Sequence, residues 1–225
     1  MPRRPRYASG GVVFHVLNRR AGAAALFEGQ ADYQAFEQIL AEAHERVRMR
    51  TLAYCLVPTH WHLVVWPRGD GDLSEFLRWV SVTHAQRWHA AHGTVGTGPL
   101  YQGRYKSFPI QKDEHLLTLC RYVERSAVRA RLVRRAERWR WSSLWRREFA
   151  SPEEQAWLSA WPVARPKNWL PLVNAAQTQA AEEAVGRCLA RSRPFGTDRW
   201  TARMARRLGL ERTLRPRGRP RKHKP

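Results

Sequence analysis

The segment Val57-Pro58-Thr59-His60-Trp61-His62-Leu63-Val64-Val65 places two histidines on either side of one bulky apolar residue. Side chains of a β-strand alternate between its two faces, so a strand over 60–66 brings His60 and His62 to the same face. Trp61 and Leu63 then point to the opposite face, toward a core. Two neutral imidazoles placed in this way are able to share one metal ion, although ordinary histidines near a strand end show the same spacing.

The segments around this stretch alternate between strand and helix. Apolar runs predict strands over 12–17, 51–57 and 60–66, the last two forming a hairpin around Pro58, and a short strand that ends near Ile110. Apolar residues at helical spacing predict helices over 32–47 and 72–92. The order strand, helix, strand, strand, helix, strand is that of an α+β ferredoxin-like antiparallel sheet with its helices on one face.

Beyond Ile110 the chain is mostly helical and basic. Helices are predicted over 113–131, 177–190 and 197–208, the last beginning at the cap signal Thr197-Asp198. Tryptophans spread between the first two of these helices predict an extension that packs back on the sheet. The predicted organisation is an α+β domain over 1–135, a tryptophan- and arginine-rich extension with a helix over 136–190, and a helix-turn-helix element with a basic tail over 191–225.

The charge of the chain favours a polyanionic partner. Its 40 lysines and arginines exceed its 19 acidic residues and give a formal net charge of +21. Nucleic acid is the commonest partner for such a protein, and a high genomic GC content is the alternative source of so much arginine. The absence of a long apolar run or signal peptide argues against a membrane partner. Cys55, Cys120 and Cys188 follow no metal-binding or disulfide spacing, which favours buried thiols in a cytoplasmic protein.

The helix predicted over 113–131 carries a second candidate group. Tyr122 and Ser126 are four residues apart and therefore share one helical face. Arg121, Arg125 and Arg129 are nearby. On the helical pattern alone, Tyr122 is more often a core aromatic with a hydrogen-bonded hydroxyl. The pattern by itself does not decide between a structural and a chemical role.

Several further motifs stand in order along the chain and span most of residues 5–220. They are Pro58-Thr59-His60-Trp61-His62-Leu63, Tyr101-Gln102-Gly103-Arg104-Tyr105-Lys106-Ser107, Arg121-Tyr122-Val123-Glu124, Ala127-Val128-Arg129-Ala130, Trp141-Ser142-Ser143 and Arg193-Pro194-Phe195-Gly196-Thr197-Asp198. Together they resemble the REP-associated tyrosine transposases. These are bacterial members of the single-tyrosine HUH superfamily, related to the transposases of the smallest insertion sequences.

The resemblance implies that His60 and His62 bind a divalent metal and that Tyr122 is the nucleophile that attacks a phosphodiester of single-stranded DNA. A tyrosine nucleophile leaves a 5′-phosphotyrosine link, which conserves the bond energy for rejoining. The family usually shows Asn-Pro where this chain has Ser126-Ala127, so Ser126 is a weaker candidate for completing the metal shell. Mg²⁺ or Mn²⁺ suits two imidazoles supplemented by water and phosphate oxygens, and zinc is the runner-up.

The expected partner is single-stranded or hairpin DNA, in particular at repetitive extragenic palindromes. Arginines near Tyr122 are also expected to help its phenol ionise. The tail over 215–222 resembles an AT-hook, with a sequence-blind basic tail as the alternative. The sequence leaves open whether the protein works as a monomer or a homodimer. The candidate DNA-binding residues are Asn18, Arg19, Arg104, Lys106, Arg121, Arg125, Arg217 and Arg219.

Two other functions compete with a tyrosine transposase. One is a domesticated DNA-binding protein without catalysis, in which the Ser126-Ala127 pair has cost metal binding. The other is a rolling-circle replication initiator or relaxase, although those proteins generally carry a larger histidine cluster or paired tyrosines. The presence of His60, His62 and Tyr122 together favours the transposase. A covalent protein–DNA adduct would separate it from the first alternative.

Overall fold

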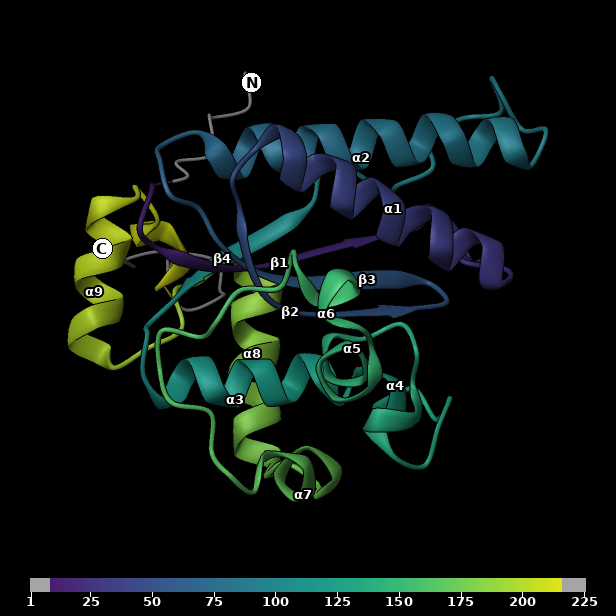
Figure 1. Cartoon of the computed structure of the whole chain (residues 1–225). Helices are drawn as coiled ribbons and strands as arrows, with labels where there is room; N and C mark the ends of the chain where they lie inside the picture. The colour runs from purple at the N-terminus through teal and green to yellow at the C-terminus, as the bar shows by residue number, and fades with distance from the viewer. Residues whose placement is uncertain (1–8, 216–225) are drawn as a thin grey trace, which may run out of the picture.

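A computed structural model describes residues 9–215 of the protein (Figure 1). At its centre lies a four-stranded antiparallel sheet with the strand order β2-β3-β1-β4. This order arises because each helical crossover skips one strand, as in ferredoxin-like folds. The predicted α+β class and sheet are therefore confirmed. The strands are β1 (Val13–Arg19), β2 (Arg50–Val57), β3 (His60–Trp66) and β4 (Lys106–Ile110).

Helices α1 (Gln30–Arg46) and α2 (Asp72–Ala91) cover one face of the sheet (Figure 1). The alternation of side chains along β3 sends Trp61, Leu63 and Val65 into this layer, where they pack in one buried cluster with Phe36 and Phe76. The other side chains of β3 face the opposite layer. The sheet is therefore buried on both faces, which explains why its strands read as almost continuous apolar runs.

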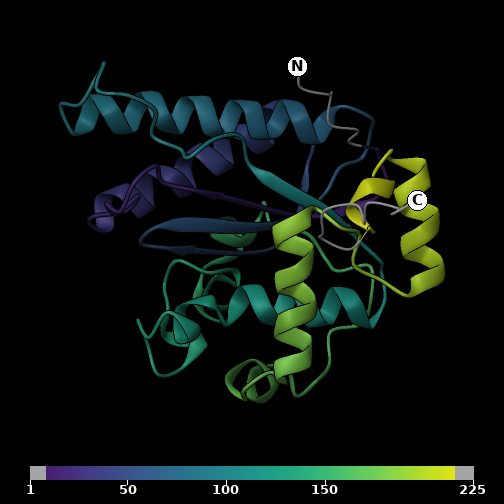
Figure 2. The ribbon, with the colours of Figure 1, turned by 180° about the vertical axis from the view of Figure 1, so that it is seen from behind.

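The opposite face is covered by several shorter helices, which Figure 2 shows from behind. The single helix predicted over 113–131 consists of two helices joined at Arg125, and the chain leaves the second at Arg131, which has a left-handed backbone with φ 59°. The helices after β4 are α3 (Glu114–Glu124), α4 (Ser126–Arg129), α5 (Ser143–Phe149), α6 (Pro152–Gln155), α7 (Trp169–Asn174) and α8 (Gln179–Arg191), with 3₁₀ turns at Ala136–Arg138 and Glu211–Thr213.

The tryptophan-rich segment over 139–161 packs along the outer edge of β2, in agreement with the sequence. The backbone N–H of Leu56 donates to the carbonyl oxygen of Trp141 over 2.9 Å, and the indole N–H of Trp161 donates to the carbonyl oxygen of Leu52 over 2.7 Å. The N–H of Ser159 donates to the carbonyl of Thr51 over 2.8 Å. These bonds satisfy backbone groups of an edge strand that would otherwise need water.

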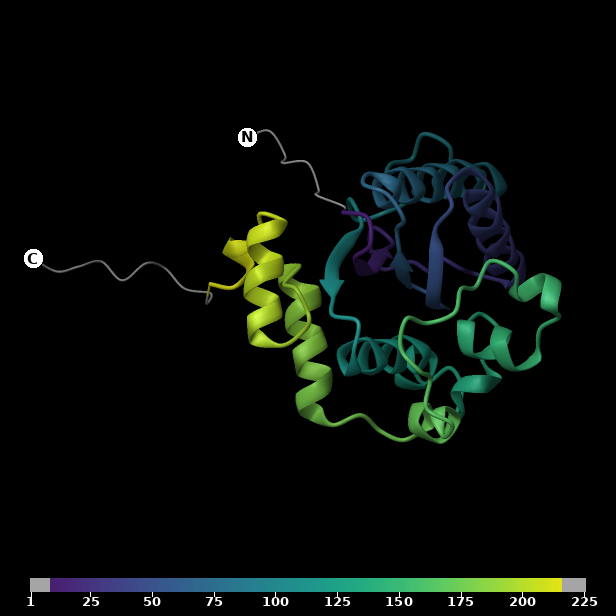
Figure 3. The same ribbon diagram turned by 60° about the vertical axis from the view of Figure 1, so that its left-hand side comes forward.

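The C-terminal part of the described chain is fastened to the other edge of the sheet. Phe195 forms a parallel bridge with Ile110, with its N–H 2.8 Å from the carbonyl of Pro109. Helix α9 (Asp198–Arg207) follows (Figure 3). The hydroxyl of Thr197 accepts from the backbone N–H of Trp200 in its first turn, as predicted. Between α8 and α9 the chain thus pairs with β4 instead of forming a free turn. Arg217 and Arg219 lie outside the described residues.

Candidate active site

Three histidines from the two central strands share the face of the sheet that α3 covers. His60 lies opposite Arg19 in the β1–β3 register and His62 lies opposite Leu17, which places His15 on the same face. The ring centroids of His60 and His62 are 4.9 Å apart, and those of His15 and His62 are 5.1 Å apart. The predicted common face of His60 and His62 is therefore present, with a third histidine beside them.

Each histidine of the predicted pair has one ring nitrogen bonded and the other free of protein partners. Nδ1 of His62 lies 2.9 Å from Nε2 of His15, and Nδ1 of His60 lies 3.0 Å from the hydroxyl oxygen of Thr59. Among residues 9–215, neither Nε2 atom of the pair makes a hydrogen bond to the protein. Histidine ligands of metals typically show this arrangement, in which the second nitrogen is held by a neighbouring group.

The electrostatics of the site keep these imidazoles neutral. Burial, together with the charges of Arg129 and His60, lowers the pKa of His15 to about 3. Burial and then the charge of Arg19 lower the pKa of His60 to about 4, and burial holds the pKa of His62 well below its usual value. A neutral imidazole has a lone pair to offer a cation, so the pair is suited to metal binding at neutral pH.

Tyr122 reaches this group from α3. Its ring stands edge-on to the ring of His62, with centroids 6.0 Å apart and planes at 89°. The guanidinium of Arg129 lies over the Tyr122 ring at 3.6 Å and donates to the Tyr122 carbonyl oxygen over 3.0 Å. The structure thus brings Tyr122 to the histidines and clamps it with an arginine one turn beyond Ser126.

The hydroxyl of Ser126 is already engaged in this clamp. It donates to the carbonyl oxygen of Tyr122 over 3.2 Å and accepts from the guanidinium of Arg129 over 3.0 Å. The side chain is buried, with 3% of its surface exposed. Its role as a metal ligand stays a prediction.

His15 is a residue of the site that the sequence did not single out, whereas Arg129 was placed near Tyr122 and within a motif without a role of its own. The spacing of seven between Tyr122 and Arg129 is two helical turns, so the helical pattern could have indicated the arginine. His15 lies in an apolar run, and only its register against β3 shows that it meets His62. That register joins segments 47 residues apart and leaves no local trace in the sequence.

The guanidinium groups of Arg121 and Arg125 lie at the end of α7. The guanidinium of Arg121 donates to the carbonyl oxygens of Ala175 and Ala176 over 2.9 and 3.0 Å. That of Arg125 donates to the carbonyl oxygen of Asn174 over 2.7 Å. Such bonds satisfy carbonyls that the end of a helix leaves unpaired. Contact of these two arginines with DNA stays a prediction, and Arg129 is the arginine that lies on Tyr122.

A polar cavity of about 360 Å³ opens beside the histidines, where β1 ends and β4 begins. Arg19, Arg104 and Lys106 all line it, as does Asn18. In the sheet register, Arg19 and Lys106 belong to the face of the histidines, whereas Asn18 belongs to the face of α1 and α2. The four strand-end residues predicted from the sequence are therefore gathered in one place.

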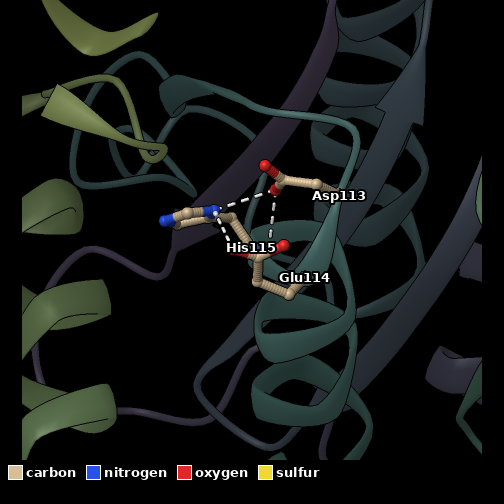
Figure 4. A group of neighbouring side chains, drawn as sticks. All are labelled: Asp113, Glu114 and His115. Carbon is tan, nitrogen blue, oxygen red and sulfur yellow. Dashed lines mark hydrogen bonds and ion pairs between the residues drawn. The ribbon is translucent and has the colours of Figure 1, made fainter. Parts of the chain in front are cut away.

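A separate group of possible ligands lies at the start of α3. Figure 4 shows Asp113, Glu114 and His115, whose ligand atoms lie within 4.8 Å of one another. The Asp113 carboxylate accepts from the backbone N–H of His115 over 2.9 Å and bonds its ring Nδ1 over 2.8 Å. This geometry is that of a helix N-cap, which accounts for the group without an ion.

Residues 10–126 match the family model described as "Transposase IS200 like". This span is more than half of the chain and contains His15, His60, His62 and Tyr122. The chain belongs to the IS200-like transposase family. The resemblance carried by the sequence motifs is thereby confirmed for the family.

Among solved structures, the chain is similar to a REP-associated tyrosine transposase bound to a REP hairpin. The two are 20% identical with a TM-score of 0.53, and the match covers 68% of this chain and 90% of the other. At this identity the likeness shows the fold. No protein of curated function matches the chain. None of the helices within the described span is long and apolar enough to cross a membrane.

Proposed function

We propose that the protein is a metal-dependent single-stranded DNA endonuclease and transposase that nicks and rejoins DNA through a 5′-phosphotyrosine link. The observation that carries this proposal is the position of Tyr122, with its ring 6.0 Å from that of the neutral His62 and its face under Arg129. A tyrosine with only a packing role would not require both a neighbouring neutral histidine and an arginine on its ring. The membership of the IS200-like family supports the same chemistry.

In the proposed reaction, the phenol oxygen of Tyr122 attacks the phosphorus of a phosphodiester. An O–P bond to tyrosine forms while the bond between phosphorus and the 3′ oxygen breaks. The phenol gives up its proton and the departing 3′ oxygen takes one up as a hydroxyl. Arg129 holds the ring through its cation–π contact and the Tyr122 carbonyl, so the nucleophile is positioned before DNA arrives.

His60 and His62 would hold the divalent metal through Nε2. The donor set fits this role because both imidazoles are neutral and both Nδ1 atoms are already held by Thr59 and His15. Such an ion polarises a phosphoryl oxygen and orients the leaving group. Two imidazoles leave the remaining positions to water and phosphate oxygens, which favours Mn²⁺ or Mg²⁺ over a closed structural zinc site.

Arg19, Arg104 and Lys106 around the polar cavity would bind phosphates of the strand next to the scissile bond. The protein of similar fold is bound to a REP hairpin, and we infer hairpin-forming repetitive extragenic palindromes as the substrate here. Their unpaired flanks would enter the cavity. Recognition of this kind needs a single strand near Tyr122 and a duplex stem elsewhere on the surface.

A denaturing gel tests the proposal. A hairpin oligonucleotide labelled at its 3′ end is incubated with wild type or Tyr122→Phe, in Mn²⁺, Mg²⁺ or EDTA. The expected result is a labelled protein band that requires metal and is absent from the variant, while a 5′-labelled copy yields a free fragment ending in a 3′ hydroxyl. Tight binding without any band, across several palindromes, would contradict catalysis and favour a DNA-binding protein that has lost it.

A further inference from the structure

Helix α9 exposes a stripe of arginines. Arg199, Arg203, Arg206 and Arg207 are all exposed, and the helix contains only one acidic residue, Asp198. Positions 199, 203 and 206 or 207 are three or four residues apart, so their side chains share one side of the helix. The stripe is a local concentration of positive charge at the surface.

The opposite side of α9 is firmly docked. Thr201, Met204 and Ala205 are buried, and the preceding Phe195 is bonded to the end of β4. Gly196 allows the chain that leads into α9 to pack closely against the helix, since a Cβ atom there would lie 2.5 Å from the ring of Trp200. The arginine stripe is therefore carried on a rigid element and presented in a fixed orientation.

The stripe lacks partners among residues 9–215. Some arginines elsewhere in the protein form ion pairs, as Arg87 does with Glu42 and Arg146 with Glu37. No ion pair or cation–π contact within the described residues involves the four arginines of α9. Arg203 and Arg207 instead line a cavity of about 290 Å³ together with Lys112. Unneutralised arginines around a hollow are a site for phosphate groups.

The cavity beside α9 and His60 lie at opposite ends of β1. The cavity beside α9 includes Val13, where β1 begins, whereas Arg19 at the other end of β1 faces His60. Six residue steps along a strand span about 20 Å. Figure 1 shows α9 and the turn that joins β2 to β3 on opposite sides of the molecule. In B-form DNA this distance corresponds to about six base pairs.

We propose that α9 binds the sugar–phosphate backbone of the duplex stem of a DNA hairpin whose single-stranded flank lies at Tyr122. This inference rests on the proposed function, because it names where the stem of that substrate is held. The contacts are with phosphates, so they fix the position of the stem without reading its sequence. One molecule would then hold both parts of its substrate.

The test compares two double variants with the same loss of charge. Arg203→Gln with Arg207→Gln removes two members of the stripe, and Arg48→Gln with Arg78→Gln removes two exposed arginines of the α1 and α2 layer. Binding of a fluorescent hairpin with a stem of about ten base pairs is measured by anisotropy from 50 to 300 mM salt. The slope of log K against log salt should fall by about 1.8 for the α9 variant and stay unchanged for the control.

Two further measurements decide the outcome. Circular dichroism and thermal melting establish that both variants are folded. A single strand without the stem should bind wild type and the α9 variant equally, and it should give the same Tyr122 adduct with both. Equal slopes for the two double variants, or an equal loss on the stemless strand, would overturn the proposal. A missing adduct with wild type would count against the proposed catalysis alone, since hairpin binding is measured separately.

Discussion

Nε2 of His15 lies 2.9 Å from Nδ1 of His62, across the two central strands of the sheet. If Nε2 of His62 binds a metal, its proton must sit on Nδ1 and be donated to His15. His15 is fully buried, so no water replaces it as the acceptor. It therefore fixes both the tautomer and the orientation of His62, which makes it a positioning residue.

Replacing His15 with phenylalanine should weaken Mn²⁺ binding about 10- to 100-fold, because the proton on Nδ1 of His62 loses its acceptor. Isothermal titration calorimetry with metal alone measures this effect. His15→Gln retains an acceptor and should restore part of the affinity. The matched control is His84→Phe, which removes an equally buried histidine from the other face of the sheet. Equal Mn²⁺ affinity for the His15 and His84 variants would refute the role.

Replacing Arg129 with leucine should slow adduct formation about tenfold or more, since the ring of Tyr122 loses its cation–π contact and its anchored carbonyl. Single-turnover rates on a saturating hairpin substrate measure the effect apart from binding. Arg134→Gln removes an exposed arginine nearby and should leave the rate close to that of wild type. The positioning role fails if both variants lose the same fraction of the rate.

Replacing Ser126 with alanine should change the Mn²⁺ affinity less than twofold. Its hydroxyl donates to the Tyr122 carbonyl and accepts from the Arg129 guanidinium, which leaves a single lone pair and makes it a weak ligand. Calorimetry measures the Mn²⁺ affinity of Ser126→Ala and of His60→Ala, and the loss in His60→Ala shows how much the removal of a ligand costs. A loss for Ser126→Ala as large as that for His60→Ala would establish the serine as a ligand after all.

The stability of the metal-free protein should fall below about pH 6.5, and His84 is one clear cause. Burial, followed by the charge of His92, lowers the pKa of His84 to about 3. Between pH 6.5 and 3, the unfolded chain binds a proton that the folded protein excludes, so the free energy of unfolding decreases as the pH falls. At pH 5 this one group costs about 2 kcal/mol.

Urea unfolding in EDTA at pH 7 and pH 5 measures this difference. His84→Phe should be less sensitive to the change of pH than wild type by about that amount, whatever its stability at pH 7. An identical pH dependence for the two proteins would mean that His84 is protonated in the folded state.

The sequence predicts those parts of the site that depend on local geometry. Alternation along β3 is enough to place His60 and His62 on one face, and the helical repeat is enough to place Tyr122 with Ser126. Contacts between distant segments carry no such local signal. The meeting of His15 with His62 depends on the pairing of β1 with β3, and the engagement of Arg121 depends on where α7 ends. The break at Arg125 stands beside Ser126, whose hydroxyl donates to the Tyr122 carbonyl four residues earlier and so competes with the helical backbone.

The segment over 139–161 has a consequence for assembly. It occupies the outer edge of β2 with main-chain and indole hydrogen bonds, as a neighbouring strand would. Exposed strand edges are the usual route by which two sheets fuse into one continuous sheet, or by which chains aggregate. Because this protein closes the β2 edge with its own chain, a second copy could extend the sheet there only by first displacing the tryptophans. An association of two copies that leaves this segment in place therefore has to use surfaces other than the β2 edge.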